Sequence, residues 1–346
     1  MIRTGRISKL LIERAREKLA DLLSCEPREL IWTSGGTEAN TLAILSAVEV
    51  TGKNHIVTST VEHHAVSEVI DYLQKKGCAV TRIPVDASGK LDPNQIAEAI
   101  RDQTALVTCM WGNNETGVLF PIRKIGQICR DRDVLFHVDG VQAVGKTPIS
   151  LTEEWIDSMA VSGHKIHGPK GIGALYLRRR TPFITMIPGG GQEKGRRGGT
   201  ENLPGIIGMG KAAELAADSL PLFSGSIPEL RQRLETELKV VFPDMKIHGE
   251  GSPRLTNTSS MCFPGIDGEA LLLGLDRRGV SVSTGSACAT GALEPSHVLL
   301  AMGVKRKDAL ATIRVSLGKQ TTQHEIESSI SAIIETVQEL ISLSPT

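Results

Sequence analysis

The sequence predicts an α/β fold with a mostly parallel sheet, followed by a smaller α+β domain. Short apolar or β-branched runs alternate with longer helical patterns in the N-terminal part, as they do in sheets covered by helices. Beyond about residue 205, long helical patterns dominate and only short strands lie between them. We therefore expect a large domain over residues 1–205 and a small domain over residues 206–346.

The chain opens on an amphipathic helical pattern. Because this segment is rich in arginine, an organellar presequence is the alternative interpretation. Glu13 and Glu17 favour an ordinary first helix, since targeting peptides of that kind are poor in acidic residues. The apolar positions that recur at helical spacing are Ile7, Leu10, Leu11, Leu19 and Leu22.

Apolar runs after this helix are typical of buried strands. Polar motifs that contain glycine or histidine follow most of them, namely SGGTEAN, EHHAV, GNNETG, DGVQ and SGHK. Because such sheets bind ligands at the carboxyl ends of their strands, we expect these loops to share one crevice. The runs are LIWT (30–33), HIVTS (55–59), AVTRIPV (79–85), ALVTCM (105–110), VLFHVD (134–139) and SMAVSG (158–163).

The second part of the chain has longer helical patterns. They are PELRQRLETELKVVF, EALLLGLDRRG and HEIESSISAIIETVQELISL, and the strands NTSSMCF and ATIRVSL lie between them. The glycine-rich stretch PGGGQEKGRRGGTEN (188–202) precedes these helical patterns. Its glycines can adopt backbone conformations that other residues rarely adopt. We expect that stretch to form a mobile or shared loop.

The composition excludes several classes of partner. Basic and acidic side chains balance at 39 each, so the net charge favours neither nucleic acid nor anionic lipid. No apolar run is long enough to span a membrane, and the N-terminus lacks the apolar core of a secretory signal. The six cysteines form no CxxC pair, which argues against a metal site and suits a reducing compartment. We expect a cytoplasmic protein without a bound metal, whose partners are small molecules or proteins.

Two candidate catalytic side chains close neighbouring strands of the predicted sheet. Asp139 ends the run VLFHVD, where a buried carboxylate needs a cation such as a protonated pyridine nitrogen. Lys165 follows the next run, where a lowered pKa would let its amine condense with an aldehyde. Taken singly, Asp139 could merely cap a turn and Lys165 could be solvated. Together they are the two groups that a pyridoxal-phosphate site must supply.

The phosphate of such a cofactor requires hydrogen-bond donors. Gly35, Gly36 and Thr37 lie at a strand-to-helix junction, where backbone N–H groups, a hydroxyl and the helix dipole favour an anion. A plain glycine turn is the alternative. Ser162 and His164 could add donors from the neighbouring loop.

Three further residues suggest steps of a reaction. His63 closes the second strand and could lie flat on a pyridine ring and move protons, although a structural histidine is the commoner case. Cys288 lies among small residues in SVSTGSACATGALEPSHVLLAMG (281–303), as a sulfur carrier would, and a tight loop is the alternative. Arg314 in ATIRVSLG suits a bidentate grip on a substrate carboxylate.

These motifs together resemble the cysteine desulfurases of the NifS/IscS type, within the class V aminotransferase family. The resemblance covers essentially the whole chain and implies a pyridoxal-phosphate-dependent transferase of fold type I, with a seven-stranded sheet. It also implies conversion of L-cysteine to L-alanine, with the sulfur kept as a persulfide for iron–sulfur cluster assembly or other sulfur transfer. The ordered motifs are TSGGTEAN, EHHAV, MWGNNETG, FHVDGVQAVGK, SGHKIHGPKGIGALYLRR, GGGQEKGRRGGTEN and TGSACATGALEPSHVLLAMG.

The resemblance implies a role for each candidate residue. Lys165 would hold the cofactor aldehyde, and Cys288 would become the persulfide. Arg314 would hold the substrate carboxylate, Asn114 would touch cofactor and substrate, and Thr200 would reach the phosphate of the other subunit of a homodimer. The other implied cofactor contacts are Asp139 on the pyridine nitrogen, Gln142 on the ring hydroxyl, His63 on the ring face, and Gly36, Thr37, Ser162 and His164 on the phosphate.

The expected reaction begins when cysteine displaces Lys165 from the cofactor. The freed amine or His63 then removes the α-proton, and the Cys288 thiolate attacks the substrate sulfur, so that alanine is released. A sulfur-acceptor or iron–sulfur scaffold protein would take the sulfur from Cys288.

One departure from the family pattern leaves alternatives open. Family members usually have a strand and a Gly-Asn-Pro stretch ahead of the helix ISKLLIERAREKLADLL, whereas this sequence starts close to that helix. We expect either a mis-set start or a shortened variant. The alternative functions are a catalytically impaired partner in sulfur trafficking and another class V enzyme, an aminotransferase or a selenocysteine lyase. Intact Lys165, Asp139 and Cys288 favour the desulfurase.

Overall fold

The computed structural model describes residues 3–284 and 294–343, which form two compact units. The first unit takes Met1–Ile83, Leu91–Gly112 and Phe120–Leu220. The second takes Pro84–Lys90, Asn113–Leu119 and Pro221–Thr346. The domain boundary expected after residue 205 lies inside helix α6 (Leu203–Ser224), whereas the division between the compact units follows Leu220.

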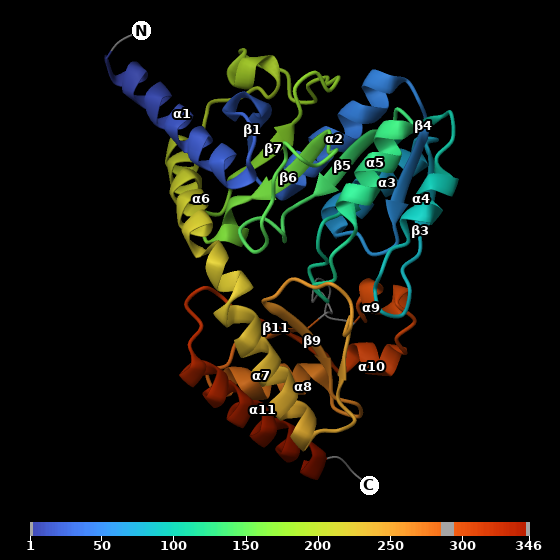
Figure 1. Ribbon diagram of the computed structural model, residues 1–346, viewed down its shortest axis with the longest axis vertical. Helices are drawn as coiled ribbons and strands as arrows, with labels where there is room; N and C mark the ends of the chain where they lie inside the picture. The colour runs from blue at the N-terminus through green and yellow to red at the C-terminus, as the bar shows by residue number, and fades with distance from the viewer. Residues whose placement is uncertain (1–2, 285–293, 344–346) are drawn as a thin grey trace. The chain divides into compact units, whose positions relative to one another are not determined.

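The first unit is built on a seven-stranded sheet in the order β1-β7-β6-β5-β4-β2-β3, shown in Figure 1. The neighbours β3, β2, β4, β5 and β6 are parallel, and β7 is antiparallel to both β6 and β1. The mostly parallel α/β fold is therefore confirmed. The strands are β1 (Leu30–Thr33), β2 (His55–Ser59), β3 (Ala79–Ile83), β4 (Thr104–Met110), β5 (Leu135–Asp139), β6 (Ser158–Ser162) and β7 (Gly173–Leu177).

Burial explains why the strand sequences are apolar without alternation. Every residue of β1, β2, β4, β6 and β7 is buried, because helices cover both faces of a parallel sheet. Since β1 and β6 are both antiparallel to β7, β1 runs in the same direction as β6. The carboxyl ends of β1, β2, β4, β5 and β6 therefore share one edge of the sheet, as the polar motifs predicted.

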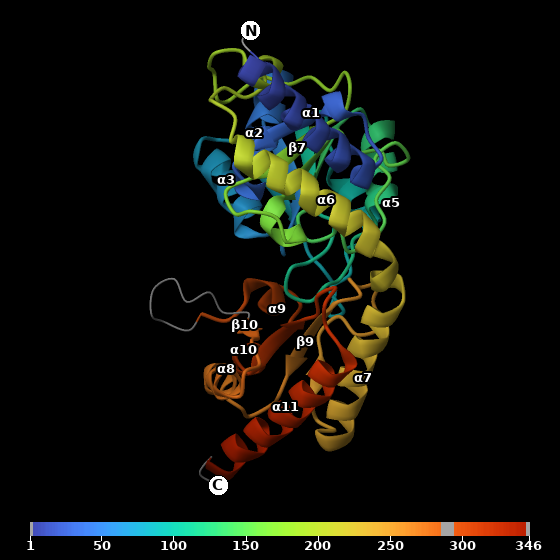
Figure 2. The same ribbon diagram turned by 90° about the vertical axis from the view of Figure 1, so that its left-hand side faces the viewer.

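Helix α2 (Gly36–Thr51) is the central helix of this unit and packs on β4, β5, β6 and β7. On another part of the unit, α1 lies beside α6 (Figure 2), where a Cβ on Gly210 would come within 2.6 Å of the Cα of Ala15. The other helices here are α1 (Arg3–Leu23), α3 (His64–Lys75), α4 (Pro93–Ala99), α5 (Ile122–Asp131) and the short 3-10 helices η1 (Pro27–Glu29), η2 (Gly163–Ile166) and η3 (Gln192–Gly195).

The second unit has a four-stranded antiparallel sheet in the order β10-β11-β9-β8. Helices α7, α8 and α11 supply one apolar core with this sheet, and the expected α+β arrangement is observed. The strands are β8 (Lys246–Ile247), β9 (Thr258–Cys262), β10 (Ser283–Thr284) and β11 (Thr312–Ser316), and the helices are α7 (Ser226–Val241), α8 (Gly268–Arg277), α9 (His297–Ala301), α10 (Arg306–Leu310) and α11 (Gln323–Leu343).

None of the helices in the described part of the chain combines the length and the apolarity that a membrane crossing requires.

Candidate active site

Asp139 is the last residue of β5 and its side chain is buried. The backbone N–H of Val141 donates to Oδ1 and the amide of Asn40 donates to Oδ2, both at 3.0 Å. Burial raises the pKa of Asp139, while these two donors and the positive charges of His63 and Lys165 act in the opposite direction. The carboxylate is therefore held at the edge of the sheet where the predicted loops converge.

A hydrogen-bonded chain supports Asp139 from behind. Asn40 on α2 lies with its Oδ1 2.8 Å from Nε2 of His137, and Nδ1 of His137 lies 2.8 Å from the Ser158 hydroxyl. Because Asn40 offers His137 only an acceptor, Nε2 carries the proton and Nδ1 accepts from Ser158. Burial lowers the pKa of His137 to about 3, so the ring is neutral at any working pH.

Sequence reasoning missed Asn40 and His137, although both left a signal. Residues 137 and 139 are two apart on β5, so their side chains share a face of the sheet. Asn40 lies four residues after Gly36 and thus one helical turn along α2. Two polar residues at alternate positions of an otherwise apolar strand, such as His137 and Asp139, indicate a hydrogen-bonding partner that both can reach.

Lys165 lies on η2, directly after β6, and is half-buried. Its neighbour His164 has Nδ1 2.9 Å from the Ser162 hydroxyl. Burial lowers the pKa of His164, and the charges of Lys165, Lys170 and Lys146 lower it further. The positive charges of three lysines thus act on the His164 side chain, and such a positive region suits an anionic ligand such as a phosphate.

The start of α2 approaches the strands closely because its N-cap and its first residue are both glycine. A Cβ on Gly36 would lie 2.7 Å from Cγ2 of Val141, and a Cβ on Gly173 would lie 2.7 Å from Cα of Gly35. Thr37 is exposed in the first turn of α2, where the positive end of the helix dipole lies. The role of Gly36 and Thr37 in binding a phosphate stays a prediction.

His63 is exposed and caps helix α3, since its Nδ1 accepts the N–H of Ala65 at 3.0 Å. In the neutral ring the proton is consequently on Nε2. The charge of His63 acts on Asp139, so both lie in one electrostatic environment. Its stacking on a ring stays a prediction.

Gln142 follows Asp139 by three residues and is half-buried. Its Oε1 accepts from Nζ of Lys146 at 2.8 Å. This contact leaves the Gln142 amide NH₂ as the group that can donate to a ligand oxygen.

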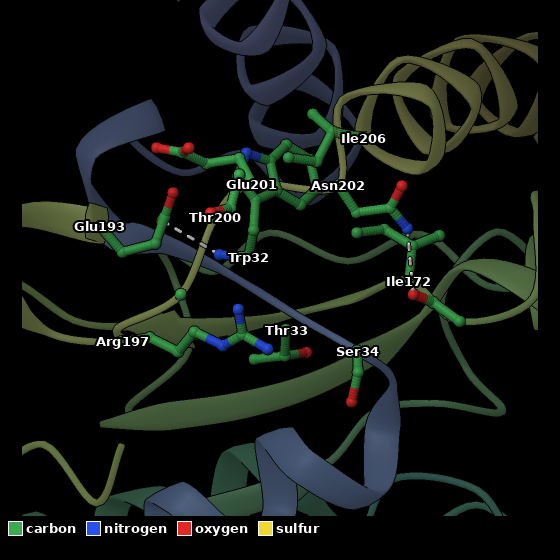
Figure 3. Close-up of a pocket in the computed structure, with 12 residues that line it drawn as sticks. Trp32, Thr33, Ser34, Ile172, Glu193, Arg197, Thr200, Glu201, Asn202 and Ile206 are labelled. Atoms are coloured by element: carbon green, nitrogen blue, oxygen red, sulfur yellow. Dashed lines mark hydrogen bonds between the residues drawn. The ribbon is translucent and has the colours of Figure 1, made fainter. Parts of the chain in front are cut away.

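Thr200 is exposed and lies at the end of the glycine-rich loop 188–202. The loop and the end of β1 enclose a cavity of about 110 Å³, and Figure 3 shows Thr200 there with Trp32, Ser34 and Arg197. Because Thr200 is exposed, its hydroxyl is accessible to a group from outside the chain.

Two ion pairs anchor this loop. The carboxylate of Glu193 accepts from both terminal nitrogens of Arg16, at 2.9 and 2.8 Å, and from the N–H of Trp32 at 3.0 Å. Arg197 donates to both oxygens of Glu38 on α2, at 2.8 and 3.1 Å. The Thr200 loop is thereby tied to the same helix that begins with Gly36.

Asn114 and Arg314 belong to the second unit. Nη1 of Arg314 donates to the backbone oxygen of Asn114 at 2.7 Å. Burial lowers the pKa of Arg314, while the charge of Glu115 raises it. Nε of Arg314 is buried with no acceptor among the described residues, and an uncompensated charged donor is costly. A substrate carboxylate would supply the missing acceptor.

Cys288 lies outside the described residues. The other cysteines are free, and burial raises the pKa of Cys25 to about 12 and of Cys262 to about 11. Burial also raises the pKa of Cys78, Cys109 and Cys129. The thiols within the described ranges are therefore protonated near neutral pH and poor nucleophiles.

Comparison with known proteins places these features in context. A family model described as "Aminotransferase class-V" matches residues 3–328. The chain is 45% identical over 342 residues to a cysteine desulfurase of Nostoc sp., with 99% of this chain and 85% of the relative covered. It is 46% identical over 336 residues to a cysteine desulfurase of Enterobacter agglomerans, with 96% and 84% covered. A solved structure titled "NIFS-LIKE PROTEIN" matches with a TM-score of 0.89 and 37% identity, covering 97% of this chain and 90% of that one.

Proposed function

This chain belongs to the class V aminotransferase family, and we propose that within it the protein is a pyridoxal-phosphate-dependent cysteine desulfurase. Two relatives that carry this name are 45% and 46% identical over nearly all of the chain. The motifs that indicated the family extend over the same length. The substrate that this function requires is L-cysteine, and the products are L-alanine and a bound sulfur atom.

The observation that carries the proposal is the buried carboxylate of Asp139, on which the charges of Lys165 and His63 act. A pyridinium nitrogen is a cation that such a carboxylate can hold, and Lys165 supplies an amine beside it. The gathering of Lys146, Lys165 and Lys170 charges suits the phosphate. These residues therefore fit the cofactor that the family uses.

We propose for this chain the cofactor contacts that the resemblance implies. Asp139 would hold the pyridine nitrogen, the Gln142 amide would donate to the ring hydroxyl, and Lys165 would hold the aldehyde. Asn114 would contact cofactor and substrate, and His63 would lie on the ring face. The proposed phosphate donors are the backbone N–H groups at Gly36, the Thr37 hydroxyl, Ser162 and His164.

When bound, pyridoxal phosphate supplies an electrophilic aldehyde and an electron-accepting ring. Arg314 holds the carboxylate of cysteine through its buried Nε, and either Lys165 or His63 takes the α-proton. The Cys288 thiolate then bonds to the substrate sulfur. The carbon–sulfur bond breaks, its electron pair stays on the carbon, and a proton completes the methyl group of alanine.

The assembly and the sulfur acceptor are also part of the proposal. Thr200 of each chain reaches the cofactor phosphate of the other subunit in a homodimer, which the exposed position of Thr200 allows. A sulfur-acceptor or iron–sulfur scaffold protein takes the persulfide sulfur. Sedimentation velocity on the cofactor-loaded protein tests the homodimer, and a monomer at micromolar concentration would contradict it.

The activity is tested by incubating the cofactor-loaded protein with L-cysteine and a thiol reductant. We expect alanine and sulfide in equal amounts from the wild-type chain. The Cys288→Ala variant should keep the visible absorbance of the cofactor and release no alanine above background. Amino transfer to a keto acid without sulfide release would instead identify an aminotransferase.

A further inference from the structure

Glu62 is a buried acid for which the reaction above has no role. It stands between β2 and His63, and its side chain is 2% exposed. Oε1 of Glu62 accepts from the hydroxyl of Ser59 and from the N–H of Met110 at 3.2 Å. Ser59 ends β2 and Met110 ends β4, so the carboxyl group bridges the ends of two neighbouring strands.

A second buried carboxyl lies at the next strand end. The register of β4 and β5 pairs Met110 with Asp139, which places the Glu62 and Asp139 carboxyls at adjacent positions along the sheet edge. Two buried carboxylates this near each other disfavour double ionisation. Asp139 has the amide of Asn40, the N–H of Val141 and nearby positive charges to stabilise its anion. The negative charge therefore settles on Asp139.

We propose that Glu62 is a positioning residue held as a neutral acid, which fixes the chain entering His63 against β4 and leaves Asp139 as the anion. This positioning role rests on the proposed function, because it is there that His63 and Asp139 are proposed to contact the cofactor. In the neutral form, Glu62 adds no second negative charge beside the carboxylate that faces the pyridine nitrogen.

The electrostatics of the neighbours agree with this geometry. Burial and then the charge of Asp139 raise the pKa of Glu62 to about 8, while the Ser59 and Met110 donors oppose the rise. Other titratable neighbours include Cys109 on β4, on whose thiol the charge of Glu62 acts, and His63, the next residue in the chain. Glu62 thus keeps its proton at pH 7.

The proton is tested directly in the cofactor-free protein by infrared spectroscopy between pH 5 and 9. We expect a carbonyl band of a protonated carboxylic acid that disappears near pH 8 in the wild-type chain and is absent from Glu62→Gln. Glu68→Gln, which changes an exposed acid of α3, should leave the band unchanged. A band at pH 7 that survives in Glu62→Gln, or no band in the wild type, overturns the proposal.

Two further variants test the neighbours and remain informative if Glu62→Gln does not fold. Ser59→Ala removes a donor to the ionised form and should move the loss of the band upward by about one pH unit. Asp139→Asn removes the neighbouring charge and should move it downward. If the pH at which the band is lost is unchanged in both variants, the assignment of the band to Glu62 is contradicted.

The positioning role is tested by cofactor affinity. Glu62→Gln keeps both hydrogen bonds and should bind pyridoxal phosphate within about twofold of the wild type, whereas Glu62→Ala should bind about tenfold more weakly. Equal affinities of the Gln and Ala variants would refute this role. Because the infrared test needs neither cofactor nor cysteine, a failure of the desulfurase assignment would not change its outcome.

Discussion

The side-chain amide of Asn40 donates a 3.0 Å hydrogen bond to Oδ2 of Asp139, and so joins α2 to the end of β5. The same amide faces the neutral ring of His137 through its oxygen. One residue thereby fixes the carboxylate that we propose holds the cofactor's pyridine nitrogen, and it also provides the hydrogen-bond acceptor for a buried imidazole.

Replacing Asn40 should lower both the stability of the fold and the affinity for pyridoxal phosphate. In Asn40→Ala the Asp139 anion loses a donor and Nε2 of His137 loses its acceptor, which should cost about 1–3 kcal/mol of unfolding free energy. Pyridoxal-phosphate titration should show weaker binding, because the pKa of Asp139 rises without that donor. Thr51→Ala, which removes a side-chain bond to the backbone at the other end of α2, serves as control and should leave cofactor affinity unchanged.

The two glycines at the start of α2, the N-cap Gly35 and the first helical residue Gly36, should differ in their tolerance of alanine. A methyl group on Gly36 would lie 2.7 Å from Val141, whose N–H holds Asp139, so Gly36→Ala should weaken cofactor binding and cost about 1–3 kcal/mol. Gly35 has extended backbone at φ 163° and nothing within 4 Å of an added Cβ. Equal cofactor affinities of Gly35→Ala and Gly36→Ala would contradict this difference.

His137 should make folding sensitive to acid. Its pKa is about 3 in the folded chain and 6.5 ordinarily, so below pH 6.5 only the unfolded chain takes up the proton. Its contribution to stability is complete above pH 6.5 and falls by about 1.4 kcal/mol per pH unit toward pH 3. Urea unfolding should show a shallower acid slope in His137→Gln. The same slope in both proteins would show that the buried ring is protonated.

Glu193 should matter for stability far more than its place in a glycine-rich loop suggests. Its side chain is 5% exposed and that of its partner Arg16 is 8% exposed, so Glu193→Ala deprives a buried guanidinium of its bidentate partner and should cost about 3–5 kcal/mol. Glu13 also contacts Arg16 but is 48% exposed, and Glu13→Ala should cost at most about 1 kcal/mol. Urea unfolding of the two variants compares them directly.

Much of the first unit could be predicted because its strands are buried on both faces. The runs 30–33, 55–59 and 158–163 correspond to β1, β2 and β6 within one residue. Strand β7 lies outside the predicted runs, because it follows directly on the glycine turn of the Lys165 motif. Local apolar pattern predicts such strands, whereas their order in the sheet depends on contacts between distant residues.

The site was predicted where its residues end strands and missed where they act from elsewhere. Asp139 closes β5 and Lys165 lies in η2 directly after β6, and this placement is readable from the sequence. The pair of Arg16 and Glu193 joins residues 177 positions apart, and no local pattern indicates it. The ion pairs that tie the glycine-rich loop to α1 and α2 were therefore not predicted, and its being mobile or shared stays a prediction.

The central claim is that Lys165 carries the cofactor beside Asp139. Lys146 and Lys170 lie near enough for their charges to act on the same histidine as that of Lys165, so the choice among the three is a real one. Reducing the loaded protein with borohydride and mapping the modified peptide by mass spectrometry decides it. We predict the pyridoxyl group on Lys165, with no label in Lys165→Ala. Label on Lys146 or Lys170, or label that persists in Lys165→Ala, would contradict the account.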